Sequence, residues 1–171
     1  MVDEFTVREL AIRAAPGAGG DEIEKIVRQI RHWTQSRLFH PLGQLHTGPG
    51  SHRKYSPDTA YVIAVLLELD GLHMPVGVLG IAASLMPGGS FWLPLPNADH
   101  QEEFQPFLDE WMKRWNEAIL GERQVLFRFW PTGPATLNNP AFIYPEDGIV
   151  TDDMVGAIAI NLTKLFNRFR E

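Results

Sequence analysis

The most restrictive feature of this sequence is a set of apolar residues that recurs every three or four positions after Asp21. Its members are Ile23, Ile26, Val27, Ile30 and Trp33. Because an α-helix has about 3.6 residues per turn, side chains at this spacing share one face. We therefore expect an amphipathic helix over residues 22–36, and a chain that contains it has to bury this face in a core.

Capping signals predict two helix starts, one before this segment and one at its beginning. Thr6 and Glu9 have the spacing of a capping box, in which both side chains satisfy free backbone N–H groups at a helix start. Asp21 and Glu24 repeat that spacing. The glycine-rich residues 16–20 break the chain between them, so the pattern predicts two helices joined by a turn.

A hairpin and two more helices are predicted to follow. Residues 38–55 are rich in glycine and proline and end in a polar, basic stretch, which is typical of a β-hairpin with a glycine turn. Ser56 and Pro57 are a cap and a first helical residue, and the apolar run behind them predicts a helix that ends at Gly71. Another helix is expected over residues 76–86.

Charge is distributed unevenly along the chain. The net charge is −6, yet residues 25–56 contain no aspartate or glutamate. The cations of this segment are Lys25, Arg28, Arg31, Arg37, Arg53 and Lys54, and its histidines are His32, His40, His46 and His52. A locally positive face can bind a polyanion despite a negative total charge, because fields are screened within about 10 Å at moderate salt.

The polar side of the predicted helix at residues 22–36 holds candidate contacts for that polyanion. Helical spacing sets Lys25, Arg28, His32 and Gln35 opposite the apolar face. The alternative interpretation is an ordinary solvated helix face, which is the more common case for any single amphipathic helix. The basic hairpin that follows favours the binding interpretation, since a helix followed by a basic hairpin is a winged-helix arrangement.

The second half of the chain predicts a small α+β domain. A proline-rich linker is expected over residues 87–99, between a domain at 1–86 and another at 100–171. Helices are predicted for residues 100–119 and 152–169, and strands for residues 124–130 and 141–144. The fold class is mainly α with small β.

Aromatic residues of this second domain have two interpretations. They are Trp111, Trp115, Phe127, Phe129, Trp130 and Tyr144. They can line an apolar effector pocket or form the core of a small domain. Core packing is the more common role for such residues.

Other classes of site find little support. The sequence has no cysteine, which excludes disulfides and cysteine-ligated metals. The histidines fall on different predicted elements without a carboxylate nearby, so no metal site or other cofactor is expected. Acidic pairs at residues 102–103 and 152–153 precede or begin helices, where capping explains them, and no catalytic motif remains. The absence of a signal-like start or a membrane-length apolar run predicts a cytoplasmic protein.

Four short segments together resemble the winged helix-turn-helix of MerR-type transcription regulators. In order they are residues 5–11 (FTVRELA), 27–33 (VRQIRHW), 37–39 (RLF) and 50–56 (GSHRKYS). The resemblance covers about the first half of the chain. The turn at residues 16–20 and the loop at residues 40–50 are longer than the family's, and no long dimerising helix follows directly.

The resemblance implies a sequence-specific regulator that binds double-stranded DNA with a recognition helix in the major groove and a basic wing on the backbone. The expected DNA contacts are Lys25, Arg28, Gln29, Arg31, His32, Gln35, His52, Arg53, Lys54 and Tyr55. It also implies a homodimer, with residues 104–119 or 152–169 as the dimer contact, a nucleoid location, and RNA polymerase or a small-molecule effector as further partners.

Two alternatives remain at this point. A winged helix also serves as a protein-binding adaptor, and an excisionase-like architectural protein bends DNA with the same fold. No membrane partner and no enzymatic activity are expected.

Overall fold

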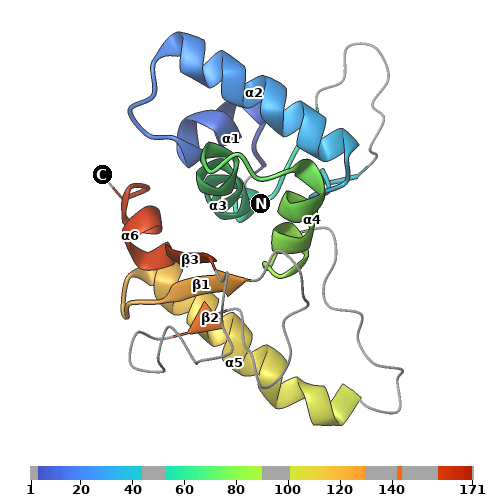
Figure 1. Ribbon diagram of the computed structural model, residues 1–171, viewed down its shortest axis with the longest axis vertical. Coiled ribbons are helices and arrows are strands. Elements are labelled where there is room, and N and C mark those ends of the chain that lie inside the picture. Colours follow the sequence, from blue (N-terminus) through green and yellow to red (C-terminus); the bar gives the residue numbers. More distant parts are fainter. Residues whose placement is uncertain (1–3, 44–52, 90–100, 130–141, 144–157, 171) are drawn as a thin grey trace. The chain divides into compact units, whose positions relative to one another are not determined.

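The computed structural model describes residues 4–43, 53–89, 101–129, 142–143 and 158–170 (Figure 1). The chain divides into two compact units, Met1–Phe91 and Trp92–Glu171. The division falls inside the segment predicted as a linker. The described part is mainly helical with a small antiparallel sheet, in agreement with the predicted class.

The first unit begins with two helices joined by a turn at residues 15–19. Helix α1 (Val7–Ala14) starts with the predicted capping box, in which Glu9 N–H donates to the Thr6 hydroxyl and Thr6 N–H donates to the Glu9 carboxylate. Gly17, in the turn that follows α1, has a φ of +82°, a conformation in which a residue with a side chain would be strained. Helix α2 (Gly20–Gln35) follows.

The start of α2 differs from the prediction. Gly19 is its N-cap and no side chain caps it, so the expected capping box of Asp21 and Glu24 does not form. Asp21 instead lies in the first turn. Glu24 is exposed and forms an ion pair with Arg8 of α1. The glycines let the helix begin before the residues that could cap it.

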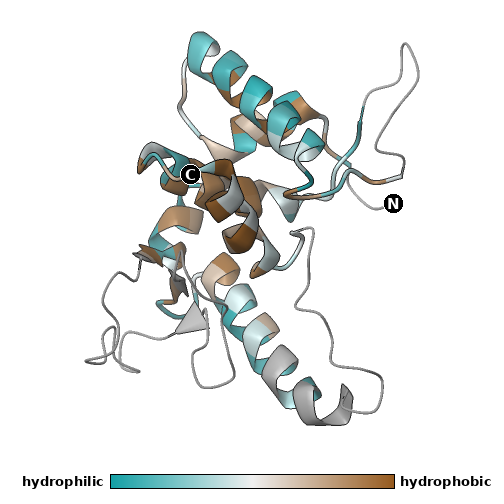
Figure 2. Cartoon of the chain, turned by 45° about the vertical axis from the view of Figure 1, so that its right-hand side comes forward, coloured by the Kyte–Doolittle hydropathy of each residue, from teal (hydrophilic) through white to brown (hydrophobic). Residues whose placement is uncertain are grey.

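The core of the first unit is built on the apolar face of α2. All five predicted residues of that face are buried: Ile23, Ile26, Val27, Ile30 and Trp33. Helix α1 packs against α2 and against α3 (Thr59–Gly71), and α3 packs against α4 (Val76–Ser84). Figure 2 shows the hydrophobic α3 beneath the hydrophilic outer side of α2.

Three backbone segments meet beside α2, where the sequence predicts the base of a wing. Phe5 and Tyr55 exchange two N–H···O bonds of 2.9 Å, and Leu42 N–H donates to the Lys54 carbonyl at 2.7 Å. Both pairings are antiparallel. We call these paired residues the wing stem. The loop that the stem would carry, residues 44–52, lies outside the described residues.

A buried hydrogen bond ties the wing stem to α2. Thr34 and Tyr55 are both fully buried, and their hydroxyl oxygens are 2.9 Å apart. The Thr34 hydroxyl already donates to the Ile30 carbonyl at 2.8 Å. Tyr55 is therefore the donor to Thr34.

The second unit packs two helices against a three-stranded sheet. Helix α5 (Gln101–Leu120) is followed by Gly121, whose φ of +67° favours glycine at this helix end. Strand β1 (Leu126–Phe129) pairs antiparallel with β2 (Phe142–Ile143) and β3 (Ile158–Asn161), in the order β2-β1-β3. The strands predicted for residues 124–130 and 141–144 are confirmed in these shorter bounds, and they pair with each other.

Of the described residues in the helix predicted over 152–169, only part is helical. Residues 158–161 form β3, and only Leu162–Asn167 are helical, as α6. The Asn161 side chain accepts a hydrogen bond from Lys164 N–H at 2.9 Å, which marks the helix start. Pairing with β1 satisfies backbone groups of residues 158–161.

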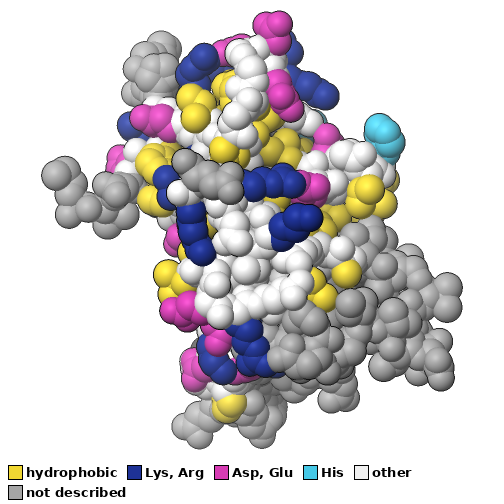
Figure 3. All heavy atoms as spheres, turned by 90° about the vertical axis from the view of Figure 1, so that its left-hand side faces the viewer, with side chains coloured by type: hydrophobic (Ala, Val, Ile, Leu, Met, Phe, Trp, Pro, Cys, Tyr) yellow, Lys and Arg dark blue, Asp and Glu magenta, His cyan; other side chains and the backbone are white. Residues whose placement is uncertain are grey.

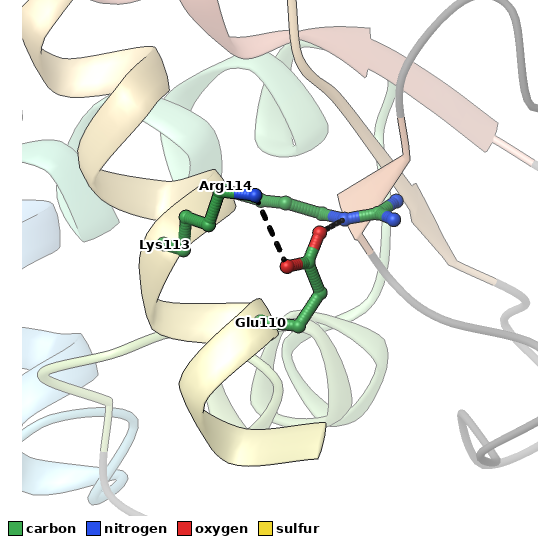
Figure 4. Close-up of polar contacts among 3 residues, drawn as sticks. All are labelled: Glu110, Lys113 and Arg114. Atoms are coloured by element: carbon green, nitrogen blue, oxygen red, sulfur yellow. Dashed lines mark hydrogen bonds and ion pairs between the residues drawn. The ribbon is translucent and has the colours of Figure 1, made fainter. Parts of the chain in front are cut away.

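A charged triplet lies on α5 (Figure 4). The Glu110 carboxylate accepts from Arg114 at 2.9 Å and from Lys113 at 3.3 Å. The hydrogen bond from Arg114 is the largest cause that lowers the pKa of Glu110, and Lys113 lowers it further.

We expect Thr34→Val and Tyr55→Phe each to lower the free energy of unfolding by about 1–2 kcal/mol, because each disrupts a buried hydrogen bond. The double variant should lose less than the sum of the two, since the second substitution removes a bond already broken. Urea denaturation followed by circular dichroism measures all three. Strict additivity would contradict the contact.

For Glu110, we expect Arg114→Gln to raise the pKa towards its ordinary value, and Lys113→Gln to raise it less. The folded pKa lies below the unfolded one, so the stabilisation exists above about pH 4.3 and is lost as pH falls through the folded pKa. Titration by NMR of the side-chain carboxyl carbon gives the values. A larger rise in Lys113→Gln than in Arg114→Gln would contradict this ranking.

Candidate nucleic-acid interface

The outward side of α2 presents a row of polar and cationic residues. Lys25, Arg28, Arg31, His32 and Gln35 are all exposed. Burial of the apolar face fixes this orientation, because residues at the complementary helical positions then have to point outward. The helix has 16 residues, which gives a rod about 24 Å long of a width that the major groove admits.

Gln29 differs from its predicted role as a DNA contact. Its side-chain amide donates to the Asp70 carboxylate of α3 at 2.7 Å, and the residue is only partly exposed. It lies at the flank of α2 that faces α3. We therefore interpret Gln29 as a link between two helices.

The first turn of α2 has the opposite charge. Asp21 and Glu22 are exposed there, where carboxylates are favoured by the positive end of the helix dipole. Glu24 is paired with Arg8. On the face shown in Figure 3, lysine and arginine side chains are interspersed with aspartate and glutamate. The excess of cations thus belongs to the later turns of α2 and to the wing stem.

A second group of cations lies in the wing stem. Arg53 and Lys54 are half-buried there, next to the backbone pairing with Leu42. The charge of Lys54 is one cause that lowers the pKa of Glu9, although the hydrogen bonds from Thr6 contribute more. Lys54 therefore lies near a carboxylate of α1, which offsets part of its charge.

Tyr55 is a correction to the predicted contacts. It is fully buried, its ring lies edge-on to Phe39 with centroids 6.1 Å apart, and its hydroxyl is bonded to Thr34. A side chain in this position anchors the wing stem and is not exposed for a surface contact. His52, also predicted as a contact, lies outside the described residues.

Arg37 is the residue whose placement the sequence pattern did not anticipate. The pattern includes Arg37 among the cations and predicts no contact for it. It is exposed directly after α2, with a φ of +61°. The sequence contains only a weak signal for this conformation. A helix end is expected near Ser36, but the residue that follows is not glycine.

The predicted pocket residues of the second unit are core residues as far as they are described. Trp111, Trp115 and Phe127 are buried, and Trp115 packs edge-on against Phe166 with centroids 5.2 Å apart. Phe129 belongs to β1 by its backbone. Trp130 and Tyr144 lie outside the described residues. The described members thus support the core interpretation.

Metal clusters and membrane-spanning helices are both absent from the described part of the chain. There, no three histidine or acidic residues lie close enough together to hold a metal ion. Within the same residues, no helix has the length and apolar character needed to cross a bilayer.

Comparison with known proteins yields no relative. No protein-family model matches the sequence, and neither a curated protein nor a solved structure shows significant similarity to it.

Proposed function

We propose that this protein binds double-stranded DNA through its first unit, with α2 in the major groove and the wing stem on the sugar–phosphate backbone. The observation that carries the proposal is the exposed row Lys25, Arg28, Arg31, His32 and Gln35 on a helix whose other face is buried. A guanidinium can hold a guanine edge or a phosphate in a fixed fork, and glutamine can pair with adenine.

The wing stem supports this arrangement. A winged helix-turn-helix needs a strand pair beside the C-terminal end of its second helix. The hydrogen bond between Thr34, near the end of α2, and Tyr55 of the stem supports such an arrangement. Arg53 and Lys54 precede Tyr55 directly, so the stem carries cations close to the end of α2. Two cationic groups on adjoining elements favour a long polyanion over a small anion.

The MerR resemblance supplies a more specific form of the proposal. A regulator of that type binds near-palindromic promoter sites as a dimer and distorts the DNA between half-sites. In this chain the second unit would supply the dimer contact, and α5 is the longest helix described there. RNA polymerase and an effector belong to this finer proposal.

We expect Arg28→Gln to weaken binding to a duplex of about 25 base pairs and to reduce the magnitude of the salt slope, d log K/d log [salt], by about 0.9, the value for one lost phosphate contact. Lys25→Gln should have the same effect, and in the double variant the magnitude of the salt slope should fall by about 1.8. Fluorescence anisotropy between about 50 and 200 mM salt measures the slope.

Lys164→Gln is the matched control, because it removes the same charge from an exposed site on α6. It should bind like the unaltered protein. All variants change exposed residues, so their melting temperatures should stay nearly constant. If Arg28→Gln and Lys25→Gln both bind duplex as the unaltered protein does, the proposal is wrong.

Salt dependence also separates this proposal from the protein-adaptor alternative. An adaptor would show no duplex binding at low salt, whereas several phosphate contacts produce a steep decline of affinity with salt. Comparing a random duplex with one selected from a random pool then shows sequence preference. Equal affinity for both would favour an architectural role over specific regulation.

A further inference from the structure

Two helices of the first unit end with a residue in an unusual backbone conformation. Among the described residues, Arg37 (φ +61°) and His73 (φ +59°) are the non-glycine residues with positive φ. In this left-handed region the Cβ atom of an L-residue comes too close to a carbonyl oxygen. Glycine avoids that contact and is the usual residue at such a position.

The hydrogen bonds show that both helix ends have the same motif. After α2, Leu38 N–H donates to the Trp33 carbonyl at 3.0 Å and Arg37 N–H to the Thr34 carbonyl at 3.1 Å. After α3, Met74 N–H donates to Leu69 at 3.3 Å and His73 N–H to Asp70 at 2.8 Å. These are Schellman motifs, with Arg37 and His73 at the position that glycine prefers.

A favourable interaction with the helix dipole does not account for Arg37. A cation near the C-terminus of a helix is stabilising, but it does not have to occupy the strained position. Gln35 and Ser36 are exposed neighbours in ordinary backbone geometry, and neither carries a charge. A cation at either place would interact with the same carbonyl groups without the steric conflict.

The place of Arg37 in the chain suggests what its charge does. It follows the cationic row of α2 and precedes Leu38 and Phe39, both buried, which lead into the wing stem at Leu42. It is therefore the cation between the two groups of the proposed interface. A helix that lies in the major groove leaves it at its ends, where the phosphate backbone passes.

We propose that Arg37 binds a DNA phosphate at the junction of α2 and the wing stem, and that its left-handed conformation is retained for this contact at the expense of stability. The inference rests on the proposed DNA binding of the first unit. Strained residues that persist in a fold often have such a role. His73, in the same conformation on α3, is outside the proposed contact set.

The test compares Arg37→Gly with His73→Gly in the full-length protein. Both should raise the melting temperature, by about 2–5 °C. Each substitution relieves the same backbone strain, and this gain exceeds the loss of stability caused by the greater unfolded-state entropy of glycine. Arg37→Gly should bind duplex roughly 5- to 10-fold more weakly at about 0.1 M salt and lose about 0.9 of the salt slope. His73→Gly should bind unchanged.

Arg37→Lys separates charge from conformation. It keeps both the cation and the Cβ atom, so we expect the salt slope of the unaltered protein and no gain in melting temperature. If Arg37→Gly binds with unchanged affinity and slope while Arg28→Gln is weakened, the inference about Arg37 is wrong and the proposed function stands. If the unaltered protein binds no duplex at low salt, both fall. A lower melting temperature in Arg37→Gly would also overturn the trade between stability and binding.

Discussion

Burial of one apolar helix face determines what the first unit can present to a partner. Because Ile23, Ile30 and Trp33 are in the core, α2 cannot rotate without exposing them. The residues on its other side are thereby held outward. The same constraint positions Thr34, which lies within the buried face and holds Tyr55, so the wing stem is oriented by α2 as well. The orientation of the candidate interface is thus a consequence of core packing.

Local patterns predicted the elements whose signals are local. The capping box at Thr6 and Glu9, the apolar face of α2 and the helix end at Gly71 are found as expected, since each depends on residues within a few positions. The short β2 was also found, because β-branched and aromatic residues favour pairing with a neighbouring strand.

The errors have long-range or competing causes. Tyr55 stands beside two cations and was expected at the surface, but it pairs with Phe5, fifty positions earlier, and nothing near it in the sequence reveals that partner. Apolar spacing at Ile158 and Leu162 fits a helix, yet β1 offers a hydrogen-bonded edge that a local pattern does not include. Gln29 is at a position expected to contact DNA, but it instead donates a hydrogen bond to Asp70, which is distant in the sequence. In each case tertiary structure decided between two locally acceptable states.

The pairing of Phe5 with Tyr55 has a consequence for the order of folding. Helices α1 and α2 are joined by a short turn, so their contacts form at a small entropic penalty. Closing the chain from Phe5 to Tyr55 is entropically more demanding, because the intervening loop is long. We expect the helical hairpin to assemble first and the stem to close onto it afterwards. Nascent or partly unfolded chains would then have the helices without the wing stem, and the proposed DNA binding would appear only at the last step of folding.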